Sequence, residues 1–257
     1  MQNIGLVLNI IGKLWGIIKC FFWRSKDIVY VNANVKNANL EEIKYHIKPS
    51  GSKYVNCQSQ RKVGLRALKW HFLKMRMSLF QIQRNAVDLS KFTYCGFASQ
   101  MFSVYDGFIL GNTMKYNFVD FNGEYYSILS TVKSRITEWD LKQDLDEVDL
   151  VVSTSYDIDT RKCKAKVQYV INDKAPEVIT DDYLEKIYAQ VKGFLDSCGN
   201  SNVKRVNLYI TAKQSVSFII GTAIQQFHPV VRIYEYRGNE FKYYLDLSKG
   251  KIFEVKE

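Results

Sequence analysis

The sequence feature that most constrains the fold is a strand-and-helix unit that occurs twice. The first copy runs from the strand-like residues 92–97 into 98–103, Ala-Ser-Gln-Met-Phe-Ser. The second runs from 203–210 into 212–217, Ala-Lys-Gln-Ser-Val-Ser. Ala, Gln, Ser and a later Gly recur at one constant offset, and the strand after each helix slips by a single residue. Because self-similarity of this kind marks repeated structural units, it predicts a tandem duplication of one α/β unit.

Further strand-like and helical segments surround these two units. Each half opens on a β-branched run that follows an aspartate, at residues 28–31 and 150–156, and such runs are typical of buried strands. Apolar residues at 3–4 spacing predict a helix over 178–198, and a basic helical stretch lies between 58 and 87. The large apolar side chains of that basic stretch are assigned to the core: Trp70, Phe72, Met75 and Met77. The 257 residues therefore predict an α/β protein of two similar halves, long enough to bury a core.

The corner between strand and helix in the second unit predicts an anion site. Thr and Ser lie around the point where the apolar helical pattern begins, which marks a helix start. Free backbone N–H groups and the positive end of the helix dipole attract anions there, and Lys213 adds a positive charge. Serine and glutamine at this position also act as ordinary helix caps, so that interpretation stays open.

Polar residues at the helix starts and strand ends make up the candidate ligand site. Open α/β sheets bind ligands beyond the carboxyl ends of their strands. In the second half we expect contacts from Lys213, Gln214, Ser215, Ser217, Ser153, Ser155 and Tyr156. In the first half, where a serine replaces the lysine, we expect contacts from Asn32, Asn34, Ser99, Gln100 and Ser103.

The chain carries a formal net charge of +10, and the excess lies in one region. Residues 43–87 contain no Asp or Glu but carry Lys and Arg throughout. Such a field favours nucleotide phosphates, nucleic acid or anionic lipid as partners, although a solvated helix face has the same composition.

Cysteine and histidine patterns indicate neither disulfides nor a metal site. The 5 cysteines show no CxxC spacing, and an odd count without a disulfide framework suits a reducing compartment. The 3 histidines are isolated, and no His/Cys spacing matches a zinc site. No GxSxG, HExxH or P-loop motif is present. The sequence therefore predicts no metal, no cofactor and no enzyme of these classes.

The N-terminus holds a second informative segment. Residues 4–23 are mostly apolar, about the length of roughly 20 residues that crosses a bilayer, and they lack the basic start and cleavage site of a secretory signal. A helical turn of about 100° per residue would gather glycine and polar residues on one arc. That arc comprises Gly5, Asn9, Gly12, Lys13, Gly16 and Lys19. Its GxxxG spacing is a pattern that lets membrane helices approach closely.

Three interpretations of residues 1–24 remain open from the sequence. The segment forms a spanning helix that oligomerises, an amphipathic helix in the membrane interface, or a soluble helix docked on a partner. A lysine inside a bilayer is costly, so Lys13 and Lys19 would face a partner helix, water or headgroups. Arg24 and Lys26 would hold the following domain on the cytoplasmic side.

The second half resembles the SAVED domain family. The resemblance rests on a diffuse pattern over 149–153, 212–221, 228–229 and 233–236, with no catalytic motif, and it covers about residues 27–257. That family looks like two fused CARF-like, Rossmann-like units, which agrees with the duplication. The resemblance thus implies a pseudo-symmetric α/β SAVED domain, divided into a first half at 27–132, a connection at 133–148 and a second half at 149–257.

Members of that family sense cyclic oligonucleotides made during phage infection, in CBASS-type or related CRISPR-linked immunity. The resemblance implies a ligand supplied by a cognate nucleotidyltransferase, with a cyclic tri- or tetranucleotide favoured over a dinucleotide. Tyr156 is then expected to stack on a base, a contact of about 1–3 kcal/mol. Ligand binding would drive self-association, cluster residues 1–24 and perturb the bacterial inner membrane from a cytoplasmic SAVED domain.

Other functions compete with this interpretation. The domain could degrade its ligand, and Asp246 with residues 254–256 imitates a nuclease spacing that arises often by chance. The basic stretch 43–87 could bind plain nucleic acid, although no sequence-specific binding is expected. A third alternative is a sensor subunit that acts on a separate effector protein.

Overall fold

The computed structural model describes residues 28–33, 53–58, 64–85, 92–111, 116–122, 125–130, 137–141, 145–237 and 240–255. The predicted membrane-associated segment 1–24 and the candidate ligand residue Asn34 lie outside these ranges. Within the described part of the chain, every helix is too short or too polar to cross a bilayer.

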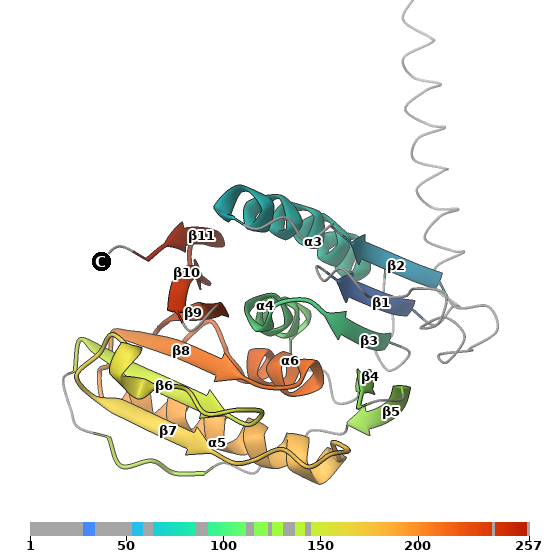
Figure 1. Ribbon diagram of the computed structural model, residues 1–257. Coiled ribbons are helices and arrows are strands. Elements are labelled where there is room, and N and C mark those ends of the chain that lie inside the picture. The colour runs from blue at the N-terminus through green and yellow to red at the C-terminus, as the bar shows by residue number, and fades with distance from the viewer. Residues whose placement is uncertain are drawn as a thin grey trace, which may run out of the picture.

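The first half, blue to green in Figure 1, forms a five-stranded sheet in the order β2-β1-β3-β4-β5. Its strands run parallel except β5, which pairs antiparallel with β4. The elements are β1 (Ile28–Ala33), β2 (Lys53–Gln58), α3 (Leu65–Asn85), β3 (Phe92–Phe97), α4 (Gln100–Leu110), β4 (Tyr116–Phe121) and β5 (Tyr125–Ser130).

The second half, yellow to red in Figure 1, forms a six-stranded sheet in the order β11-β10-β9-β8-β6-β7. Strands β6 to β9 run parallel, and β10 and β11 continue the sheet antiparallel. The elements are β6 (Glu147–Ser153), the short 3-10 helix η2 (Thr160–Lys162), β7 (Gln168–Asn172), α5 (Asp181–Asn200), β8 (Arg205–Thr211), α6 (Gln214–Ala223), β9 (Val230–Arg237), β10 (Glu240–Asp246) and β11 (Lys251–Glu254).

The two sheets share one topology. The opening strand of each half lies between the second and third strands, giving β2-β1-β3-β4 in one sheet and β7-β6-β8-β9 in the other. In both halves one helix joins the second strand to the third, and another joins the third strand to the fourth. The predicted α/β fold of two fused Rossmann-like units is therefore confirmed.

Helices α4 and α6 cross at the centre of the molecule, between the two sheets (Figure 1). Each carries the glycine of the sequence repeat at the crossing. A Cβ built on Gly107 would lie 2.0 Å from the Phe218 carbonyl oxygen, and one built on Gly221 would lie 2.0 Å from the Val104 carbonyl oxygen. Since only glycine lets the two backbones approach this closely, the repeated glycine joins the halves to each other.

An aromatic cluster continues this joint into the first half. The Phe218 ring of α6 lies 4.5 Å from Tyr94, 5.0 Å from Tyr116 and 5.3 Å from Phe118, measured between ring centroids. Phe218 is fully buried. A second-half side chain therefore completes the core of the first half, and the two halves share one hydrophobic core.

Several element ends differ from the sequence predictions. Strand β6 stops at Ser153, so Ser155 and Tyr156 lie in the loop that follows it. Helix α6 ends at Ala223, whereas the sequence predicted that it continues to Phe227. In the segment after the helix, the His228 imidazole accepts a hydrogen bond of 3.0 Å from the Gln225 backbone N–H. That bond turns the chain toward β9.

The core assignment for the basic helix α3 was right for two side chains and wrong for two. Phe72 and Met75 are buried, whereas Trp70 is 59% exposed and Met77 is 60% exposed. Buried residues of α3 recur at a spacing of three or four, and Trp70 and Met77 fall on the opposite side of the helix.

A buried polar cluster lies between β1, α3 and α4 in the first half. The Asp106 carboxyl accepts hydrogen bonds from Tyr30 at 3.2 Å, from Tyr94 at 3.1 Å and from the Asn32 side chain. The Asn32 side-chain oxygen is in turn 2.8 Å from His71 Nε2. Burial raises the pKa of Asp106 to about 8, although the three hydrogen bonds oppose the rise, and burial lowers the pKa of His71 to about 4.

This cluster predicts that the free energy of unfolding falls as the pH rises from about 6.5 to 8. Between 3.8 and about 8 folded Asp106 holds a proton that the unfolded chain releases, so its contribution is lost as pH rises through the folded pKa. The slope is about 1 kcal/mol per pH unit. His71 has its folded pKa below the ordinary value of 6.5, so it opposes the slope only below that pH. Urea unfolding at several pH values should show the fall in the wild type and a flatter profile in Asp106→Asn; equal slopes would contradict the assignment.

Candidate functional site

The two repeated helix starts meet each other across the centre of the molecule. Gln214 Nε2 donates to the Ala98 carbonyl oxygen at 2.6 Å, and Gln100 Nε2 donates to the Ala212 carbonyl oxygen at 3.4 Å. These contacts are reciprocal, because Ala98 and Gln100 hold the same places in the first unit as Ala212 and Gln214 hold in the second. The repeated Ala and Gln therefore pair the halves about a pseudo-twofold axis.

Each helix start is also bonded to an acidic side chain of the opposite half. Ser215 donates to the Asp120 carboxylate of β4, and Ser99 donates to the Glu235 carboxylate of β9. Burial raises the pKa of Asp120, and the hydroxyl and backbone N–H of Ser215 together with the Lys213 charge oppose that rise. The start of α6, predicted from the sequence to bind a phosphate, thus already binds a carboxylate of the protein.

The remaining predicted residues at the helix starts are bonded to other parts of the protein or buried in it. The Lys213 ammonium donates to the Glu177 carbonyl oxygen and to the Tyr126 hydroxyl at 3.3 Å, and it lies 5.6 Å from the Tyr126 ring centroid. Ser103 donates to the Gln214 side-chain oxygen. Ser217 is fully buried, and its hydroxyl has no hydrogen-bond partner among the described residues. The structure therefore places these side chains in the joint between the halves.

Asn32 lies in the interior because of its place in the strand register. Ala33 pairs with Phe97, and Ser153 pairs with Thr211, so Ala33 and Ser153 hold equivalent positions at the ends of β1 and β6. Successive side chains of a strand point to opposite faces, so Asn32 faces the buried cluster around Asp106.

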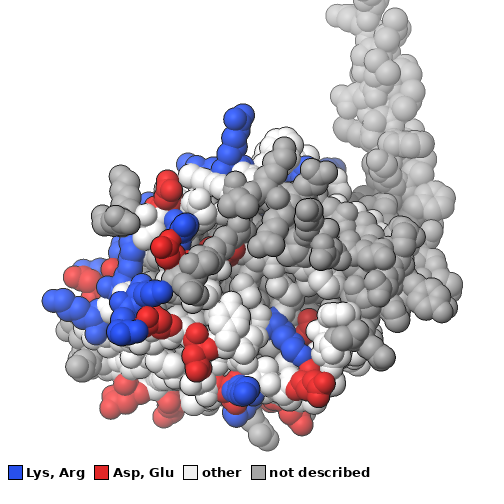
Figure 2. All heavy atoms as spheres, viewed as in Figure 1, with Lys and Arg blue, Asp and Glu red and all other residues white. Residues whose placement is uncertain are grey.

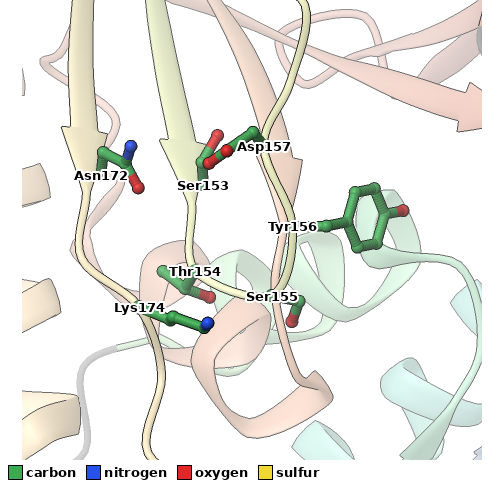
Figure 3. Close-up of a pocket in the computed structure, with 7 residues that line it drawn as sticks. All are labelled: Ser153, Thr154, Ser155, Tyr156, Asp157, Asn172 and Lys174. Carbon is green, nitrogen blue, oxygen red and sulfur yellow. The ribbon is translucent and has the colours of Figure 1, made fainter.

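A pocket opens beyond the carboxyl ends of β6 and β7, with a volume of about 260 Å³. It is lined by Ser153, Thr154, Ser155, Tyr156, Asp157, Asn172 and Lys174 (Figure 3). Three of the predicted ligand residues are among them, Ser153, Ser155 and Tyr156. The second-half strand end is therefore a part of the predicted site that the structure gathers around an open space.

The sheet topology explains why a pocket forms at this place. β6 pairs with β7 on one side and with β8 on the other, so the loops after β6 and β7 leave the sheet close together. The β6 loop is held back toward β8, because the backbone N–H groups of Thr154 and Ser155 donate to the Thr211 carbonyl oxygen at 2.9 and 2.8 Å. The switch point of the sheet, where the connections leave in opposite directions, lies between β6 and β8, and the pocket lies beside it. Open α/β sheets bind ligands beyond the carboxyl ends of their strands, as at this pocket.

The pocket lining offers hydrogen-bond donors, one cation and one carboxylate. The Ser153 hydroxyl accepts from the Ile158 backbone N–H at 3.3 Å, which leaves its O–H to donate to a ligand. Figure 3 shows Lys174 and Ser155 beyond the strand ends, with the Tyr156 ring pointing away from them. The Tyr156 ring is 51% exposed and lies 5.9 Å from the Tyr236 ring. This lining suits a ligand with both anionic and polar neutral groups.

Lys174 is the cation of the pocket lining, and the charges around it decide whether it can attract an anion. On the face in Figure 2, acidic and basic side chains lie interspersed over the lower part of the molecule. No ion pair involves Lys174 among the described residues, whereas Lys186 pairs with Asp173 at 2.5 Å. An exposed cation outside such a pair keeps its charge available to an incoming anion.

Four lining residues were missed by the sequence prediction: Thr154, Asp157, Asn172 and Lys174. Asn172 is the last residue of β7 and Lys174 lies just after it, and this strand was not predicted. The β-branched pair Val170-Ile171 before Asn172-Asp173 is the signal for a strand and turn there. The equivalent strand end of the first half leads into residues outside the described ranges.

Comparison with known proteins identifies the fold. The SAVED family, the "SMODS-associated and fused to various effectors sensor domain", matches residues 78–247. No curated protein matches the chain. The Acinetobacter baumannii Cap4 SAVED/CARF-domain containing receptor with the cyclic trinucleotide 2'3'3'-cAAA gives a TM-score of 0.55 at 11% identity, covering 85% of this chain and 50% of that one. With 3'3'3'-cAAA it gives 0.53 at 12% identity, covering 85% and 48%.

These similarities extend over most of this chain, which spans about half the length of the Cap4 receptors. The low sequence identity shows a common fold, and the family match covers more than half of the chain. Together with the duplicated sheets, this shows that the chain belongs to the SAVED family of sensor domains.

Proposed function

We propose that this protein is a receptor for a cyclic oligonucleotide second messenger in antiphage signalling, and that the messenger binds at the β6–β7 pocket. The observation that carries the proposal is the pocket itself, with the Lys174 cation and hydroxyl donors beyond the carboxyl ends of β6 and β7. The Cap4 receptors of the same fold hold cyclic trinucleotides.

Each lining group has a role in this proposal. Lys174 and the Ser155 hydroxyl bind a phosphate, because an ammonium and an O–H are charge-assisted donors to a phosphate oxygen. The Asp157 carboxylate repels a phosphate, so it accepts from a ribose hydroxyl or a base amino group. The exposed Tyr156 ring stacks on a base, contributing about 1–3 kcal/mol.

The pocket is too small to enclose a whole cyclic oligonucleotide. Its volume of about 260 Å³ is below the roughly 300–1,000 Å³ of sites that enclose a whole drug-sized ligand. One nucleotide unit therefore enters, and the rest of the ring lies across the surface. The cyclic trinucleotides held by the Cap4 receptors support a cyclic tri- or tetranucleotide over a dinucleotide.

The effector step in this proposal belongs to residues 1–24. Ligand binding promotes self-association, which clusters the N-terminal segments of cytoplasmic domains and perturbs the bacterial inner membrane. The apolar composition and glycine spacing of residues 4–23 support this. The alternative is a separate effector protein, and the proposed role of the SAVED domain is binding without catalysis.

Calorimetric titration of the full-length protein tests the proposal. We expect binding of 2'3'3'-cAAA, 3'3'3'-cAAA or a related cyclic oligonucleotide. Lys174→Glu should weaken it at least about 10-fold, because it puts a negative charge beside the bound phosphate. Lys166→Glu is the matched control, since Lys166 is an exposed lysine of the same half outside the pocket. Equal loss in both variants would indicate general electrostatics, and no loss in Lys174→Glu would remove the pocket assignment.

A further inference from the structure

The outer face of helix α3 carries an exposed apolar stripe. Trp70 is 59% exposed, Leu73 48%, Met77 60% and Phe80 62%. Their sequence spacing of three, four and three residues places them along one side of the helix. We call these four side chains the α3 stripe.

The α3 stripe is separate from the core-facing side of the helix. At about 100° per residue, its members fall within an arc of about 80°, centred roughly opposite the buried side chains. Those buried side chains are Leu68, His71, Phe72, Met75, Leu79 and Ile82. The helix therefore has two apolar faces, and within the ranges that the structure describes only one of them packs against the protein.

Basic residues border the α3 stripe on every side. On the helical wheel Arg66 and Arg84 continue its line at the two ends, while Lys69 and Arg76 lie along one edge and Lys74 along the other. No Asp or Glu occurs in α3 or anywhere between residues 43 and 87. At the top of Figure 2, over α3, white and blue surfaces adjoin.

This charge pattern narrows the choice of partner. A second copy of α3 would bring like charges together along the same seam, which opposes self-pairing. A single-stranded nucleic acid would use flat rings for stacking, but the middle of the stripe is Leu73 and Met77. An anionic bilayer matches both features, because apolar side chains enter the boundary of the acyl chains while flanking Lys and Arg reach the headgroups.

We propose that the α3 stripe lies in the surface of an anionic lipid bilayer, with the helix axis parallel to the membrane. This contact is distinct from residues 1–24 and does not depend on the cyclic oligonucleotide. It would hold the first half of the domain against the membrane in a fixed orientation.

A fluorescent label at the stripe tests this in the full-length protein. Met77→Cys is labelled with an environment-sensitive dye, in a background where Cys20 and the partly exposed Cys163 are serine; Cys57, Cys95 and Cys198 are buried. The control carries the dye at Phe227→Cys, which is 71% exposed and lies outside α3. Vesicles of phosphatidylcholine alone and with phosphatidylglycerol are compared, and the dye reads the local contact even if residues 1–24 also bind lipid.

We expect the emission at position 77 to move to shorter wavelength with the anionic vesicles, to move less at high salt, and to stay unchanged at position 227. Lys69→Gln together with Lys74→Gln should reduce the shift. An unchanged spectrum at position 77 would overturn the proposal, as would equal shifts at 77 and 227. A response to single-stranded RNA without a response to vesicles would assign the stripe to nucleic acid instead. Lys174→Glu, which tests cyclic oligonucleotide binding, should leave the dye response to vesicles unchanged. Each of the two proposals can therefore be contradicted without affecting the other.

Discussion

Gly221→Ala is expected to lower the free energy of unfolding by about 3 kcal/mol or more. The new methyl group would lie 2.0 Å from the Val104 carbonyl oxygen and 2.9 Å from the Phe108 backbone nitrogen. Overpacking a core usually costs about 1–3 kcal/mol, and here the obstacle is the backbone of α4, which cannot rotate away as a side chain can. Relief requires the two central helices to separate, and that separation also breaks the contacts between the halves. Urea unfolding monitored by circular dichroism measures the loss.

Gly199→Ala is the matched control for this prediction. Gly199 is also helical, in α5, but a Cβ built there meets nothing within 4 Å. Alanine is favoured over glycine in a helix by about 1 kcal/mol, so this variant should be neutral or slightly more stable than the wild type. Equal stability of Gly221→Ala and Gly199→Ala would mean that α4 and α6 are not held at this distance.

The repeat in the sequence predicted the fold, and most of the ligand residues predicted at the repeated helix starts lie in the joint between the halves. Alanine, glutamine and glycine at one offset correctly indicated two equivalent units. The sequence does not state how two units dock, and here they dock through the repeated residues themselves. Gln100 and Gln214 recur because each bonds to the backbone of the other unit, so the repeat reports the joint between the halves.

Strand register accounts for the remaining differences in the site. Asn32 and Ser153 were both predicted as strand-end contacts, but Asn32 lies one residue before the equivalent position. Because side chains alternate between faces, one residue separates the pocket from the interior. Asn172 ends β7 and Lys174 lies just after it, and the five residues of that strand, with three apolar ones in a row, give only a short strand signal.

Helix α3 shows a further limit of sequence patterns. Apolar residues at a spacing of three and four occur on both of its faces, so the pattern alone assigned Trp70 and Met77 to the core. The structure separates the faces, because the sheet of the first half contacts only one side of the helix. The second apolar face of this basic helix can therefore be recognised only after the structure shows which face packs against the sheet.

Phe218→Ala is expected to cost about 3–5 kcal/mol of the free energy of unfolding, the usual range for removing a buried phenylalanine. Its ring has no exposed surface and packs on three aromatic rings of the first half, so the cavity would open between the halves. Phe227→Ala is the control: that ring is 71% exposed, and its loss should change stability by no more than about 0.5 kcal/mol. If the halves depend on this shared core, Phe218→Ala should lower the unfolding midpoint of the whole domain in one transition. A loss below about 1 kcal/mol, similar to that of the control, would contradict a shared core, because Phe218 would then contribute no more to stability than an exposed ring does.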